Sequence, residues 1–159
     1  MATIDRADWH YGGEFPEQLP AENGGNHIGM YLSWIINNDL IGKLHLEESK
    51  EGLQEVKNRS ITGRDFLFDH CDGKFWDEDL NEEGLEFTRH YYQNPKDPNG
   101  GYGQYLEDYE IELGSPYDSL YEIPNTWENY DLISKRIDEE YIKWKNHKTK
   151  RRWKFWSKK

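Results

Sequence analysis

We expect a mainly α-helical protein, built as a single compact domain of about five to six helices with an ordered N-terminal loop and few or no strands. Three observations predict this fold class. The chain has 159 residues, a length that suits one hydrophobic core. Apolar residues recur at helical spacing in several segments, and no segment shows a convincing strand-like alternation. Aromatic residues make up 15% of the chain, so we expect them to be the main packing material.

The N-terminal part is predicted to be an ordered loop followed by the first helix. Aromatic residues are mixed with glycine and proline from Trp9 to Gly25, a composition typical of a loop laid across a core. From Asn26 onwards, apolar residues recur every three or four positions until Asn37-Asn38-Asp39 ends the run. This pattern predicts a helix that buries Ile28, Leu32, Ile35 and Ile36.

Three further helices are predicted in the middle of the chain. The weakest pattern runs from Ser49 to Asn58. The second helix follows Thr62, whose hydroxyl suits an N-cap, and ends where Gly73 turns the chain. The third follows Asn81 as N-cap and stops near Asn94, and two glutamates in its first turn suit the positive end of the helix dipole.

Two helices are predicted after an exposed loop over residues 96–101. The first covers Tyr105 to Leu113 and ends before Gly114. The second is the best marked helix of the chain, since Asn125 and Glu128 fit a capping box. Its apolar stripe consists of Trp127, Tyr130, Ile133, Ile137, Tyr141 and Trp144. We therefore divide the chain into an acidic globular domain, residues 1–144, and a basic aromatic C-terminal tail, residues 145–159.

Charge is distributed very unevenly along the chain. Residues 1–142 contain 31 acidic and 11 basic residues, a formal charge of −20, whereas residues 143–159 contain nine basic residues and no acidic one. A body with this much negative charge attracts cationic partners and repels nucleic acid, so we expect no nucleic-acid partner.

The densest acidic segment runs from Asp65 to Glu86, where Lys74 is the only base among nine acids. Like charges held this close favour binding of a cationic partner, unless they are merely solvated helix faces. Within this segment the candidate partner-binding residues are Asp72, Trp76, Asp77, Glu78, Asp79, Glu82, Glu83 and Glu86.

The tail combines bases with large aromatic side chains. This composition suits contact with a membrane surface or with phosphate groups, because bases attract the anions and aromatic rings insert at the interface. The candidate contact residues are Arg151, Arg152, Trp153, Phe155 and Trp156. An alternative is that the tail covers the acidic face of its own body.

The sequence predicts no catalytic residue, no metal site and no cofactor. The six histidines are scattered without the short paired spacings of zinc sites. The single cysteine, Cys71, excludes an internal disulfide and is expected to be buried and inert. If Cys71 were a nucleophile, only His10 and His27 in the early glycine-rich segment would suit as its base.

Several sequence blocks resemble an uncharacterised family of small acidic bacterial proteins, over roughly Asp8 to Trp144. They are Asp8-Trp9-His10-Tyr11, Glu22-Asn23-Gly24-Gly25, His27-Ile28-Gly29-Met30, Cys71-Asp72-Gly73-Lys74, Asp77-Glu78-Asp79-Leu80-Asn81-Glu82-Glu83-Gly84 and Thr126-Trp127-Glu128-Asn129-Tyr130-Asp131. The resemblance implies a relation to the immunity partners of secreted antibacterial toxins, and it supplies no catalytic residues.

These observations lead to one expected function and two alternatives. We expect an immunity-type binding protein that neutralises a secreted antibacterial toxin by covering a cationic surface or active site with its acidic face. The alternatives are a small enzyme using loop histidines with Cys71 or an acid, and a regulatory domain held at the membrane surface by its tail. The start of the chain lacks the apolar run of a secretory signal, so we expect a cytoplasmic protein, in the third case peripheral to the inner membrane face.

Overall fold

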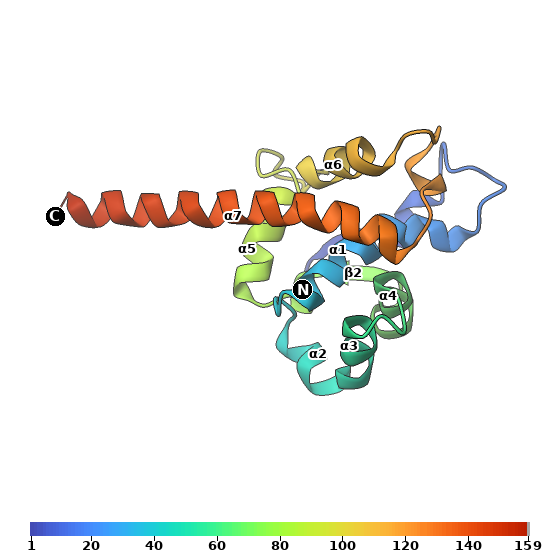
Figure 1. Ribbon diagram of the computed structural model, residues 1–159, viewed down its shortest axis with the longest axis horizontal. Helices are drawn as coiled ribbons and strands as arrows, with labels where there is room; N and C mark the ends of the chain where they lie inside the picture. Colours follow the sequence, from blue (N-terminus) through green and yellow to red (C-terminus); the bar gives the residue numbers. More distant parts are fainter. Residues whose placement is uncertain (159) are drawn as a thin grey trace.

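The computed structural model describes residues 1–158 and confirms the mainly α-helical fold (Figure 1). Within these residues there are seven α-helices, namely α1 (Asn26–Asn37), α2 (Lys43–Glu48), α3 (Lys50–Lys57), α4 (Gly63–Cys71), α5 (Glu82–Tyr91), α6 (Gln104–Leu113) and α7 (Trp127–Ser157). The short elements are the strands β1 (Thr3–Arg6) and β2 (Lys74–Trp76) and the 3-10 helices η1 (Ala7–His10), η2 (Ala21–Gly25), η3 (Asp77–Asp79) and η4 (Leu120–Glu122).

Helix α1 lies at the centre of the molecule and is buried on every side from Asn26 to Ile36. It contacts α3, α4 and α7, so it has no polar face. The approach of α4 is close enough that two glycines meet: a Cβ atom on Gly63 would lie 1.9 Å from the carbonyl oxygen of Gly29. These two helices therefore touch backbone to backbone.

Aromatic rings fill the core around α1, as the composition predicts. The ring of Tyr31 lies 4.9 Å from that of Tyr92 and 5.0 Å from that of Tyr105, and all three side chains are fully buried. Trp34 and Phe87 continue the cluster towards α7. Rings at these separations stabilise the core by more than the free energy expected from their buried area alone.

The N-terminus forms a strand as well as a loop. Strand β1 pairs antiparallel with β2, with Asp5 opposite Phe75, and this is the only sheet in the described part of the chain. The pair is held further by the amide of Ala2, which donates to Asp77 Oδ1 at 2.9 Å. Strands of three and four residues are too short for the alternation that identifies a strand in a sequence.

The predicted helices are present, with one addition and one shift. Helix α2 has only six residues, too few to show a periodic pattern, and was not predicted. Thr62 and Asn81 are N-caps as predicted, and accept from the amides of Asp65 and Gly84. The N-cap of α7 is Thr126 and not Asn125, because the Thr126 hydroxyl accepts the Asn129 amide.

Helix α7 is continuous from the body into the tail. Its predicted stripe faces the core: Tyr130, Ile133 and Ile137 are buried, while Trp127, Tyr141 and Trp144 are partly buried against it. The helix then continues to Ser157, so the predicted boundary after residue 144 falls inside it, and its C-terminal part extends beyond the rest of the molecule (Figure 1). No helix among residues 1–158 is both long and apolar enough to cross a membrane.

Candidate functional site

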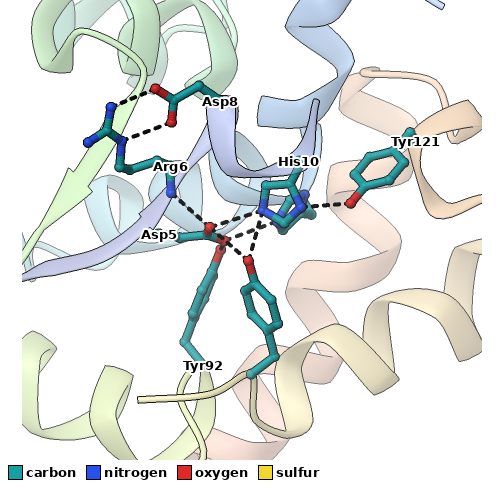
Figure 2. A network of polar contacts seen from close by, with 8 residues as sticks. Asp5, Arg6, Asp8, His10, Tyr92 and Tyr121 are labelled. Carbon is teal, nitrogen blue, oxygen red and sulfur yellow. Dashed lines mark hydrogen bonds and ion pairs between the residues drawn. The ribbon is translucent and has the colours of Figure 1, made fainter. Parts of the chain in front are cut away.

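The carboxylate of Asp5 is the centre of a buried polar network (Figure 2). Its Oδ1 lies 3.0 Å from Nε2 of His10, and its Oδ2 lies 3.1 Å from Nε2 of His27. The hydroxyls of Tyr92 and Tyr102 donate to the two oxygens at 2.5 and 3.2 Å, and the amide of Arg6 donates to Oδ1 at 2.8 Å. One carboxylate therefore meets five donors.

Five segments of the chain bring these groups together. The 3-10 turn η1 folds His10 back over Asp5 in β1, and His27 lies in the first turn of α1. Tyr92 follows α5 directly, and Tyr102 lies in an isolated β-bridge with Gln93. Tyr121 in η4 completes the network through a 2.7 Å hydrogen bond between its hydroxyl and His10 Nδ1.

The network holds Asp5 in its charged form. Burial alone raises the pKa of Asp5, but the hydrogen bonds from His10 and His27 outweigh it and hold that pKa well below its usual range. Burial also lowers the pKa of His27, although the neighbouring Asp5 acts in the opposite direction. A neutral His27 that donates through Nε2 leaves Nδ1 as a buried acceptor, and this atom has no partner among the described residues.

The acid and the two histidines of this network are buried, whereas Tyr102 and Tyr121 extend from it to surface hollows. Asp5 and His27 have no exposed surface and His10 is 6% exposed. His10 and His27 do lie within hydrogen-bond reach of an acid, but that acid, Asp5, is fully buried and has no direct contact with solvent. The network has a structural effect. Through Asp5 and His10, its hydrogen bonds connect β1, η1, α1, the loop after α5 and η4.

A second buried cluster contains Cys71, and its histidine is neither His10 nor His27. The Cys71 Sγ lies 3.7 Å from Nε2 of His45, and the same nitrogen lies 2.8 Å from Oδ1 of Asp79. The pKa of the Cys71 thiol is raised, first by burial and then by the charge of Asp79. Cys71 is buried as predicted, whereas its pairing with His45 was missed because α2 carries no recognisable pattern.

The predicted partner-binding residues occupy three different environments. Asp79 is 3% exposed and is held by His45, so its carboxylate is not available to a partner. Asp72, Glu83 and Glu86 are paired with Lys74, Lys145 and Lys148. Asp77, Glu78 and Glu82 form no ion pair within residues 1–158, and Trp76 is partly buried at the edge of a cavity.

The first two lysines of the tail cover part of the acidic segment. The Nζ atom of Lys145 lies 2.6 Å from Glu83, and Lys148 pairs with Glu86. These groups line a groove of about 540 Å³ between α5 and α7. The hydrogen bonds from Lys145 and Tyr141 lower the pKa of Glu83, so its charge is already compensated. Lys145 and Lys148 therefore lie as expected if the start of the tail covers the acidic face of its own body.

Residues 149–158 of the tail are exposed. Trp153, Phe155 and Trp156 are 75%, 63% and 70% exposed, and Arg151 and Arg152 are exposed beside them. All five predicted contact residues therefore lie on the part of α7 that extends from the body (Figure 1).

An acidic surface that the sequence did not indicate lies around η4. Two adjoining hollows of about 320 and 240 Å³ share Glu110 and Asp118, and Glu14 lines the larger one. These three acids are exposed and form no ion pair in the described part of the chain. Phe15 and Tyr117 lie in the same walls. We call this surface the η4 acidic groove.

The comparison with protein families accounts for most of the chain. Residues 3–123 match the model of a Domain of unknown function (DUF7832), a region that includes both buried clusters and ends before α7. The predicted resemblance to an uncharacterised family is thereby confirmed, although its last block, residues 126–131, falls outside the matched region. No curated protein and no solved structure matches the chain. The chain thus belongs to the DUF7832 family.

Proposed function

We propose that this protein acts by binding and without turnover. It neutralises a basic protein partner by covering a cationic surface or active site of that partner, as the immunity protein of a secreted antibacterial toxin does. The observation that carries the proposal is the η4 acidic groove, where exposed unpaired carboxylates surround aromatic side chains.

The composition of the groove suits a lysine- or arginine-rich surface. Within residues 1–158, Glu14, Glu110 and Asp118 form no ion pair with a lysine or arginine, so a cationic partner gains their attraction and is steered towards them. Tyr117 is 40% exposed, and aromatic side chains of this kind provide most of the binding energy in many interfaces.

The segment from residue 72 to 86 contributes less to this proposal than its charge suggests. Asp72, Glu83 and Glu86 are already paired with lysines, and a partner would have to displace those lysines to use them. The exposed, unpaired charge of the segment is confined to Glu78 and Glu82, with Asp77 half-buried. We therefore place the main contact at the η4 acidic groove.

A matched pair of triple variants tests this assignment. The probe is the purified product of a toxin-like reading frame next to the gene, and binding is followed by biolayer interferometry at low and at high salt. Each variant removes three negative charges: one is Glu14→Gln, Glu110→Gln, Asp118→Asn, and the other is Asp77→Asn, Glu78→Gln, Glu82→Gln.

We expect the groove variant to associate at least about tenfold more slowly and to lose most of its salt dependence, because steering charges act on the association rate. The second variant should stay within about threefold of the unchanged protein. Equal losses in both variants would show that only net charge matters. Absence of binding by the unchanged protein would contradict the proposed function.

The extended end of α7 favours a second candidate, contact with a phosphate-bearing membrane surface. At about 100° per residue, Lys150, Arg151 and Lys154 fall on one side of the helix and Trp153 and Trp156 on another, with Phe155 next to the basic side and Arg152 next to the tryptophans. The bases of such a helix attract anionic headgroups, and its tryptophans suit insertion at the lipid interface. The protein would then hold its acidic body beside the membrane.

A further inference from the structure

We infer that His45, Cys71 and Asp79 form a binding site for a single zinc ion. The proposal is independent of the proposed partner binding, because it concerns a metal ion and a different part of the molecule.

The three donor groups converge on one point from three elements. His45 lies in α2, Cys71 is the last residue of α4 and Asp79 ends η3. Their donor atoms all lie within 4.8 Å of one another, with Nε2 to Oδ1 at 2.8 Å and Sγ to Nε2 at 3.7 Å. A tetrahedral zinc ion with bonds of about 2.0 Å to nitrogen and oxygen and about 2.3 Å to sulfur requires separations of roughly 3.3 and 3.6 Å. For the Nε2–Oδ1 pair, entry of the ion therefore requires a widening of about 0.5 Å, whereas the Sγ–Nε2 separation already fits.

The side chains of His45 and Asp79 are oriented by further hydrogen bonds, as metal ligands usually are. Nδ1 of His45 lies 3.0 Å from the hydroxyl of Ser49, which fixes the ring so that Nε2 faces the cluster. The other oxygen of Asp79 accepts the amide of Trp76 at 2.7 Å. Such partners set the tautomer and direction of a ligand, and their loss typically weakens metal binding.

A route from solvent reaches the cluster. His45, Cys71 and Asp79 are all buried, yet all three line a cavity of about 320 Å³ together with Met1, His70 and Glu78. Three protein donors with an accessible fourth position are typical of zinc sites that keep a water ligand. The combination of imidazole, thiolate and carboxylate favours zinc over magnesium or calcium, which prefer oxygen alone.

The same geometry does not suit a cysteine nucleophile. In a catalytic cysteine–histidine–acid arrangement, the cysteine and the acid use opposite nitrogens of the ring. Here Cys71 and Asp79 both face Nε2 of His45, and Nδ1 is occupied by Ser49. A ring nitrogen that faces both a thiol and a carboxylate suits a cation shared by the three groups better than it suits a relay through the ring.

The Asp5 network is a poorer candidate, although Asp5, His10 and His27 also lie close enough to hold a metal. The oxygens of Asp5 already face five donors, and the hydroxyls of Tyr92 and Tyr102 occupy the space beside them. Neither Asp5 nor His27 has any exposed surface through which an ion could enter.

Spectroscopy of the full chain tests the zinc site directly. The protein is treated with a chelator, dialysed and titrated with Co²⁺, and Zn²⁺ is then added as competitor. We expect one Co²⁺ per chain, a thiolate-to-cobalt charge-transfer band, visible bands intense enough for four-coordination, and their loss when Zn²⁺ displaces Co²⁺. X-ray absorption of the zinc-loaded protein should show one sulfur at about 2.3 Å and the remaining ligands near about 2.0 Å.

Variants assign the donors. Cys71→Ser should abolish the charge-transfer band and weaken zinc binding by about 100-fold, and Ser49→Ala should weaken it about tenfold. The matched control is His70→Gln, because His70 lines the same cavity but stacks on Phe66 at 4.6 Å between ring centroids. The inference is overturned if the unchanged protein binds no stoichiometric zinc, if its X-ray absorption shows no sulfur ligand, or if His70→Gln loses as much affinity as Cys71→Ser.

Discussion

Replacing Asp5 by asparagine is expected to lower the free energy of unfolding by about 3–5 kcal/mol, the usual cost of removing one partner from a buried ion pair. The structure gives the same magnitude independently. An asparagine keeps one oxygen and places an NH₂ group where the other was. The NH₂ group then faces either the His27 and Tyr92 donors or the three donors at Oδ1. Two buried donors that lose their acceptor, at about 1–3 kcal/mol each, lower the free energy of unfolding by about 2–6 kcal/mol.

Urea unfolding measures this loss. With a slope of about 2 kcal/mol per molar urea, the midpoint of Asp5→Asn should fall by about 2 M. Asp118→Asn is the matched control, since that acid is exposed and unpaired in the described chain, and its effect should stay within about 0.5 kcal/mol. A midpoint of Asp5→Asn within about 0.3 M of the unchanged protein, at the same slope, would refute the assignment of Asp5 as the charge that holds these segments together.

The pH dependence of the same pair of proteins provides a second test. The folded pKa of Asp5 is depressed, whereas an unfolded aspartate has a pKa of about 3.9. The stabilisation is therefore fully present above about pH 4 and is lost as the pH falls towards the folded pKa. The stability difference between the unchanged protein and Asp5→Asn should shrink below about pH 4. A difference that stays constant down to about pH 3 would show that the charge of Asp5 is not responsible.

Three further predictions concern the helices. Gly63→Ala should destabilise the protein by about 3 kcal/mol in urea, because its Cβ atom would collide with the backbone of Gly29, whereas Gly12→Ala has open space and should be nearly neutral. Thr126→Ala should cost about 1 kcal/mol, since it removes the N-cap of α7; a change below about 0.3 kcal/mol would contradict that role. A chain ending at Asn146 should keep its melting temperature within a few degrees but should no longer co-sediment with anionic vesicles that the full chain binds; equal sedimentation of both would exclude the membrane contact.

Features fixed by neighbouring residues could be predicted from the sequence, and features fixed by distant pairing could not. The N-caps Thr62 and Asn81 are recognisable because each bonds to an amide three residues away. The apolar stripe of α7 is recognisable because one helix repeats the pattern many times. In contrast, β1 and α2 are too short to produce a pattern, and each depends on contacts made elsewhere in the chain.

The two buried clusters show the same division. Asp5 and His10 are five residues apart, but Tyr92 and Tyr102 reach Asp5 across 87 and 97 residues. His45 meets Cys71 across 26 residues and Asp79 across 34. No local spacing in the sequence indicates such contacts. Because metal-binding histidines and cysteines are expected in close pairs, the sequence analysis predicted no metal site at these residues. Only the juxtaposition of α2, the end of α4 and η3 brings the three donors together.

Charge along the chain and charge in space are different quantities, and this difference changes where a partner is expected. The acids of residues 72–86 are dense in sequence, yet the lysines of α7 lie against α5 and neutralise two of them. Glu14 and Asp118 are just over a hundred residues apart, and no local pattern links them with Glu110, but the fold places all three acids around adjoining hollows without an ion pair among residues 1–158. Such an arrangement has an electrostatic cost in the free protein, because like charges are held together in the absence of a counter-ion. A basic partner removes that cost, and this is why the η4 acidic groove, and not the densest acidic stretch, is the better place to search for one.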